Sequence, residues 1–264
     1  KGLVAYYPFN GNAKDESGNG NDGKVHGASL TRDRFGNSIS SSAYLFDGKT
    51  DYIDASDKGL PSRADNRTLS FWVRNDGYEG NSGHHIVNYG TANHRQAFGV
   101  NYSEDIPGFP IRVLGIYTHA ADDVLVRKGL PVNKWSHIVV TYSSKKSALY
   151  FNGKLAGTGK QQLNTRLSRL RIGGAPYTLF FSQYAFKGAV DDIRIYNRVL
   201  NKTEVKALFD SENTNEPPKI VTQPLSQKII EGSSVILSVV ATGGGFLKYS
   251  WKKDGMEGGG WSIG

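Results

Sequence analysis

Short segments in which apolar residues alternate with polar ones recur through the first four-fifths of the chain, with glycine, asparagine and aspartate between them. A period of two places alternate side chains on opposite faces of a strand, and the intervening residues favour turns. The segments are residues 3–9, 43–46, 69–73, 86–89, 97–102, 111–117, 135–142, 148–151, 167–172 and 190–196. So many short strands predict an all-β fold, a sandwich of two antiparallel sheets.

One hairpin and one helix are marked by specific residues. Asn152 and Gly153 stand between two apolar segments, and this dipeptide supplies the positive φ values of a type I′ turn. A short helix is predicted after Asn201, whose side chain can cap the free N–H groups while Glu204 completes a capping box. Val205 then falls on the face of the helix that packs against the sandwich.

A change of composition at residues 211–218 predicts a linker. The stretch is polar and ends in Pro217 and Pro218, which cannot continue a helix or join a sheet interior. We therefore predict a domain at 1–211, a linker at 212–218 and a second domain at 219–264. The last resembles the front half of an immunoglobulin-like domain with Trp251 in its core, although it is too short for a complete one of about 100 residues.

Composition narrows the class of protein. With 38% hydrophobic and 21% charged residues and a mean hydropathy of −0.44, the chain is typical of a soluble globular protein. It has no cysteine, which excludes disulfides, thiolate zinc sites and cysteine nucleophiles. No apolar run approaches the roughly 18 residues of a membrane span. The chain begins with Lys1 and shows no leader, so we expect a mature fragment of a secreted or cell-surface protein.

The net charge of +8 is unevenly distributed. Residues 1–100 contain 11 basic and 11 acidic side chains, whereas residues 101–200 contain 14 and 6. Such an excess often serves solubility alone, and the alternative is an anionic partner such as an acidic polysaccharide. The basic side chains are scattered rather than arranged as a stripe with aromatics, so a nucleic acid is not predicted as a partner.

Seven sequence pieces, taken in order, resemble laminin G-like domains of the concanavalin A-like lectin/glucanase superfamily. They are the loop at 10–23, residues 46–53, 69–74, 135–142, 149–155, 170–174 and 186–200. The resemblance covers residues 2 to about 210 and implies a jelly roll of two antiparallel sheets. It does not fix a function, because this scaffold hosts lectins, carbohydrate-binding modules and glycosidases.

The first loop is dense in asparagine, aspartate and glycine, which are both ordinary turn residues and suitable oxygen ligands for calcium. The resemblance implies a structural calcium ion that joins this loop to the last strand. The matching positions are Asn10, Asp15, Asn19, Asn21 and Asp191. A carboxylate such as Asp191 inside an apolar strand would be costly without a cation.

Catalysis within this chain is disfavoured. Glycosidases need two facing carboxylates about 5–9.5 Å apart, and no inward strand carries such a pair. His84, His85 and His94 stand in segments with the composition of loops, and no Gly-x-Ser-x-Gly elbow is present.

Aromatic rings, planar polar side chains and cations are the groups that hold sugars. The candidate ligand-binding residues are His85, Tyr89, Arg95, Asn101, Arg112, Tyr117 and Tyr177. We therefore predict a non-catalytic carbohydrate-binding module for an acidic polysaccharide, a monomeric module of a larger secreted bacterial protein. A protein-interaction or adhesion domain is the alternative. A glycoside hydrolase or polysaccharide lyase ranks third, and it would require His85, Tyr89 and Arg95 to converge.

Overall fold

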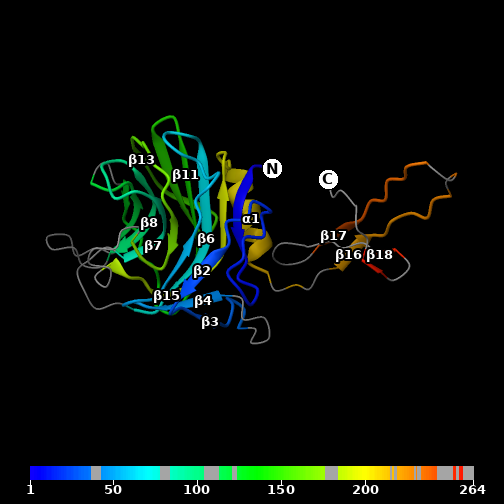
Figure 1. The fold of residues 1–264 in the computed structure, drawn as a ribbon, viewed down its shortest axis with the longest axis horizontal. Helices are drawn as coiled ribbons and strands as arrows, with labels where there is room; N and C mark the ends of the chain where they lie inside the picture. The colour runs from blue at the N-terminus through cyan, green and yellow to red at the C-terminus, as the bar shows by residue number, and fades with distance from the viewer. Residues whose placement is uncertain are drawn as a thin grey trace. The chain divides into compact units, whose positions relative to one another are not determined.

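Two antiparallel sheets lie face to face in the first part of the chain (Figure 1). The computed structural model describes residues 1–36, 43–77, 84–103, 113–120, 124–175, 184–214, 216, 219–228, 230, 233–242, 252–253 and 256–257. The chain divides into two units, Lys1–Lys206 and Ala207–Gly264. The domain limits predicted from composition stay a prediction.

One sheet has eight strands in the order β13-β12-β11-β6-β15-β4-β3, with β1 paired to β15. Its strands are β1 (Leu3–Tyr7), β3 (Ser29–Thr31), β4 (Ala43–Asp47), β6 (Arg67–Asn75), β11 (Trp135–Ser143), β12 (Lys146–Phe151), β13 (Lys154–Lys160) and β15 (Lys187–Tyr196). β15, the last of them in the sequence, lies between β6 and β4, so the end of the unit is built into the middle of the sheet.

The other sheet has seven strands in the order β10-β9-β8-β7-β14-β5-β2. They are β2 (Gly23–His26), β5 (Tyr52–Ala55), β7 (His84–Gly90), β8 (Ala97–Ser103), β9 (Val113–Tyr117), β10 (Val124–Val126) and β14 (Leu170–Ile172). The all-β sandwich prediction is confirmed, and each of the ten expected segments contains a strand. β2, β3, β5 and β10 were not expected, because strands of three or four residues are too short to show a period.

The marked hairpin and helix are present as predicted. β12 pairs with β13 through a turn in which Asn152 and Gly153 have φ values of 48° and 72°. α1 (Lys202–Glu212) begins after Asn201, whose Oδ1 accepts the N–H groups of residues 203 and 204, while Glu204 accepts the Asn201 N–H in return. Val205 is fully buried.

Alternation along β6 shows how the sandwich is filled. Leu69, Phe71 and Val73 belong to the core between the sheets, whereas Ser70 and Trp72 point to the opposite face of the eight-stranded sheet. Those two outward side chains are nevertheless buried, with exposed fractions of 0% and 3%. The outer face of this sheet is therefore covered, and polar groups on it need partners from the chain itself.

A β-bulge in β15 places three charged side chains on that covered face. The register with β6 shifts between Asp191 and Arg194, and Asp192 has a φ of 48°. The extra residue lets Val190 and Ile193 both face the core, while Asp191 and Arg194 face outward.

The second unit contains two short antiparallel pairs in its described part. β16 (Lys219–Thr222) pairs with β17 (Val240–Thr242), and β18 (Lys252–Lys253) pairs with β19 (Met256–Glu257). Trp251 lies outside the described residues, and the immunoglobulin-like assignment stays a prediction. None of the helices in the described residues is both long enough and apolar enough to cross a bilayer.

Candidate functional site

Three of the predicted ligand-binding residues meet on the side of the seven-stranded sheet that faces away from the core, here called the seven-strand face. Asn101 on β8 is the register partner of His85 on β7. The ring of Tyr117 on β9 meets the His85 ring edge to face, with centroids 4.4 Å apart. The Tyr117 hydroxyl also shares a hydrogen bond of 2.5 Å with Nδ1 of His119. The centroid of the Tyr184 ring lies 5.8 Å from the centroid of the His85 ring.

Two other predicted residues lie elsewhere. Tyr89 belongs to the core, where its hydroxyl contacts the carbonyl of Pro61 and the guanidinium of Arg67. Arg95 lies in the turn after β7, and its Nη1 is 3.2 Å from the side-chain oxygen of Gln162. His85, Tyr89 and Arg95 therefore do not converge. Arg112 and Tyr177 lie outside the described residues.

A second cluster occupies the same face on β5 and β14. The guanidinium of Arg171 makes a two-pronged contact with Asp54, at 2.6 and 2.7 Å, and lies 4.3 Å from the centroid of the Tyr52 ring. Tyr52 in turn stacks on His26, with centroids 4.4 Å apart and planes inclined by 14°. Arg171 is fully buried, whereas Tyr52 and His26 are partly exposed, so the cluster offers flat aromatic surfaces, the kind of platform on which the apolar face of a sugar packs.

Asn88 connects the two clusters. The paired strands place Arg171, Asn88, Gly99 and Tyr117 in one row across the sheet. Asn88 is fully buried, and within the described residues neither its Nδ2 nor its Oδ1 makes a hydrogen bond of ordinary geometry. Its side chain lies over Gly99, where a Cβ would collide with it. The amide also stabilises the charged form of the His85 imidazole, and a buried amide that lacks hydrogen bonds of ordinary geometry costs about 1–3 kcal/mol, so this position favours a ligand that supplies them.

Electrostatics keep this part of the face neutral. Burial lowers the pKa of His85 to about 4, an effect that the Asn88 amide opposes and the other two imidazoles, His84 and His119, reinforce. His85 is therefore an uncharged imidazole at neutral pH, able to donate one hydrogen bond and accept another.

Asn88, Tyr52, Asp54 and Arg171 were not predicted from the sequence. In the segments 52–55 and 170–172 the signal was available, because Tyr52, Asp54 and Arg171 alternate with apolar residues that fill the core. For Asn88 it was not, since a register shift between His85 and Val87 changes which residues share a face.

In the first loop, the residues predicted to bind calcium make hydrogen bonds to other groups of the chain. Asp15 is held by backbone N–H groups, with Oδ1 accepting from Tyr6 and Ser17 and Oδ2 from Asn21. The Asn19 side chain donates to the carbonyl of residue 4, and the carbonyl of Asn10 accepts from a side chain of the same loop.

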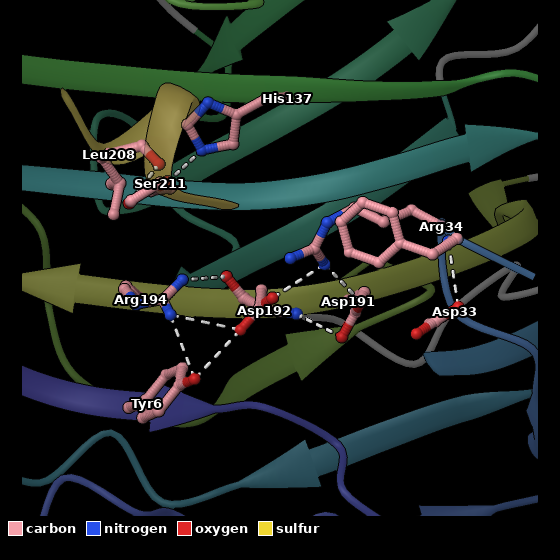
Figure 2. A network of polar contacts seen from close by, with 11 residues as sticks. Tyr6, Asp33, Arg34, His137, Asp191, Asp192, Arg194, Leu208 and Ser211 are labelled. Carbon is pink, nitrogen blue, oxygen red and sulfur yellow. Dashed lines mark hydrogen bonds and ion pairs between the residues drawn. The ribbon is translucent and has the colours of Figure 1, made fainter. Parts of the chain in front are cut away.

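Asp191 belongs to a separate buried network on the outer face of the eight-stranded sheet (Figure 2). Its Oδ2 lies 2.8 Å from Nη1 of Arg34, which is also 2.8 Å from Asp192. Asp192 further contacts Arg194 and the Tyr6 hydroxyl, at 3.2 and 3.0 Å. Burial alone would raise the pKa of Asp192, but Arg194 and then Arg34 lower it below its usual value.

These contacts do not gather Asp15 and Asp191 around one cation. Within the described part of the chain, no three histidine, aspartate or glutamate side chains form a metal-binding group. Tyr6 joins the first loop to the closing strand, since its N–H donates to Asp15 and its hydroxyl donates to Asp192. The calcium ion stays a prediction from the sequence.

Comparison with known proteins identifies the family to which the chain belongs. Residues 47–206 match the model of a laminin G-like family described as the concanavalin A-like lectin/glucanases superfamily. A comparison with curated proteins gives no match.

Several solved structures share the fold. Domain 4 of AbnA, an extracellular arabinanase from Geobacillus stearothermophilus solved with arabinotriose, is 21% identical, with a TM-score of 0.57 over 78% of this chain and 97% of that one. Botulinum neurotoxin type C, in a structure whose subject is interaction with gangliosides, is 17% identical, with a TM-score of 0.59 over 81% and 52%. A Trypanosoma rangeli sialidase is 19% identical, with a TM-score of 0.59 over 80% and 33%. At these identities the likeness concerns the fold.

Proposed function

The chain belongs to the concanavalin A-like lectin/glucanases superfamily, and from this premise we propose that Lys1–Lys206 is a non-catalytic carbohydrate-binding module. Its ligand lies on the seven-strand face. The proposal is supported by the arabinotriose complex of the arabinanase domain and by the ganglioside interaction of the neurotoxin, two glycan ligands on the same kind of sandwich.

The observation that carries the proposal is the buried Asn88 amide between two flat clusters. Arg171 stands on one side of it in the row, and Gly99 and Tyr117 stand on the other. A sugar offers both hydroxyls for the amide and C–H faces for the rings, so a single ligand class satisfies both parts of the face.

The same face does not favour hydrolysis. Among the outward positions of the described strands of the seven-stranded sheet, Asp54 is the one carboxylate, and it is engaged by both Arg169 and Arg171. Acid and base catalysis on a glycosidic bond needs a second carboxyl group opposite the first.

Finer assignments follow from charge and composition. The excess of basic residues favours an acidic polysaccharide, and electrostatic binding of this kind weakens as salt increases. We place the module in a secreted bacterial protein, with an immunoglobulin-like spacer after the linker. A role in adhesion to another protein is the alternative, and it would use the same face.

Affinity electrophoresis through gels that contain neutral or acidic polysaccharides, at two salt concentrations, tests the proposal. Retention by at least one glycan is expected, and Asn88→Ala should weaken it about tenfold without lowering the melting temperature. Thr158→Ala, at an exposed position on β13, is the matched control and should bind normally. Absence of retention by every glycan would refute the proposal.

A further inference from the structure

A polar cavity lies where three loops meet. Its volume is about 520 Å³, and its lining includes Ser62, Arg63, Gln96, Asn164, Thr165 and Arg166. These residues belong to the segments that enter β6, connect β7 to β8, and enter β14.

Backbone hydrogen bonds fix the cavity walls. Arg63 and Thr165 exchange both of their backbone hydrogen bonds, at 2.7 and 3.2 Å, as in a short antiparallel ladder. The N–H of Arg166 donates to the carbonyl of Gln96 at 3.1 Å, which ties the third loop to the same frame. The cavity is therefore preformed, which lowers the entropic cost of binding.

A buried cation lies directly beneath these walls. Arg67 is fully buried, and its guanidinium donates to the carbonyls of Ser62, Arg63 and Asp65 and to the hydroxyls of Tyr89 and Thr165. All of these acceptors are neutral, although an arginine in a protein interior is usually paired with a carboxylate. Ser62, Arg63 and Thr165 both hold this cation and line the cavity.

The surrounding charges leave the cavity positive. Arg63 and Arg166 contribute two further guanidinium groups at exposed positions. The Asp65 carboxylate accepts from the N–H and the hydroxyl of Ser62, so it offsets part of this charge. Asp57 is bonded to the N–H of Ser168 and interacts with Arg169, and burial raises its pKa.

We propose that this cavity binds the anionic group of an acidic glycan, either a carboxylate or a sulfate. Arg63 and Arg166 provide charge-assisted hydrogen bonds to the oxyanion, and the side chains of Gln96, Asn164 and Ser62 contact neighbouring hydroxyls. The buried Arg67 adds a positive potential that solvent screens little. The inference rests on the proposed glycan-binding function and names the class of ligand.

Three monosaccharides that differ only at carbon 6 provide the test: galactose, galacturonate and galactose 6-sulfate. Each is titrated into isotopically labelled protein while the backbone amide signals are recorded by NMR. We expect the two anionic sugars, and not galactose, to shift the signals of residues 62–67, 95–96 and 164–167. A response to one anion alone would identify the group that the cavity accepts. No response at these residues to either anion would overturn the proposal.

Variants separate this cavity from the seven-strand face. Arg63→Gln with Arg166→Gln should remove the shifts and reduce retention by acidic polysaccharide about tenfold, with retention by neutral glycans unchanged. Lys145→Gln with Lys154→Gln removes the same charge from exposed positions on the β11–β12–β13 hairpins and should leave the shifts intact. Asn88→Ala should weaken polymer binding through the face about tenfold yet preserve the shifts. Equal shifts in the double arginine variant would contradict the proposal.

Discussion

Arg34 and Asp191 are 157 positions apart in the sequence, yet Nη1 of Arg34 lies 2.8 Å from Oδ2 of Asp191. Their side chains are only 7% and 2% exposed. The same guanidinium lies 4.8 Å from the centroid of Trp72, on the neighbouring strand β6. The pair thus joins the loop before β4 to the closing strand β15 within a layer that excludes water.

Removal of this cation should destabilise the fold. Arg34→Met leaves Asp191 and Asp192 buried without the guanidinium that pairs with both, while Arg194 still contacts Asp192, and breaking a buried ion pair costs about 3–5 kcal/mol. Urea unfolding at pH 7 measures the free energy of unfolding. Arg74→Gln, which breaks a partly exposed pair with Asp76, is the control and should cost about 1 kcal/mol or less.

A double substitution keeps this prediction open to refutation. If Arg34→Met is too unstable to purify, Arg34→Met with Asp191→Asn should recover part of the loss, because one buried charge is removed with its partner. Equal stability of the wild type and the single variant would show that the network contributes little.

Acid should weaken the fold through His137. Its Nε2 lies 2.8 Å from the Ser70 hydroxyl, and burial, followed by the charges of Arg194 and Arg34, lowers its pKa to about 3. The unfolded chain takes up a proton near pH 6.5 while the folded chain does not. The free energy of unfolding therefore keeps its full contribution from His137 above about pH 6.5. It falls by up to about 1.4 kcal/mol per pH unit as the pH drops toward the pKa of His137 in the folded chain.

Urea unfolding at pH 7, 6 and 5 measures this dependence. His137→Gln should reduce this dependence, because the variant no longer binds a proton on unfolding at this position, while His85, whose pKa is also lowered by burial, keeps its own part of the slope. The same slope in His137→Gln and the wild type would contradict the assignment.

The predicted calcium ion has a direct test. If an ion binds only the folded chain, calcium raises the melting temperature and a chelator lowers it, and Asp15→Asn should abolish the difference. Arg34→Met provides a comparison, since it removes the cation that already pairs with Asp191. Identical melting curves with and without the chelator would refute the calcium prediction.

Gly115 keeps room for Asn101 on the seven-strand face. A Cβ at Gly115 would collide with the amide oxygen of Asn101, which is the flexible end of a side chain and can move aside. Gly115→Ala should therefore leave the melting temperature nearly unchanged but weaken glycan retention several-fold. Gly99→Ala is the contrast, because its Cβ would meet the backbone of Val87 and Asn88, and it should destabilise the fold. Unaltered retention in Gly115→Ala would remove Asn101 from the ligand site.

Local patterns in the sequence determined the longer strands, the Asn152–Gly153 hairpin and the capped helix after Asn201. Each depends on neighbours only a few residues apart, so propensity and period suffice. The same patterns found His85, Asn101 and Tyr117, because side chains of recognition chemistry were concentrated in those segments.

Tertiary structure alone decided which side chains share a face. In β7 the bulge turns both Ile86 and Val87 toward the core, so Asn88 rather than Tyr89 lies on the side of His85. In β15 the bulge at Asp192 sends Asp191 to the covered outer face, where Arg34 meets it. One inserted residue reverses the alternation of everything beyond it, and only pairing with distant strands fixes where the insertion falls.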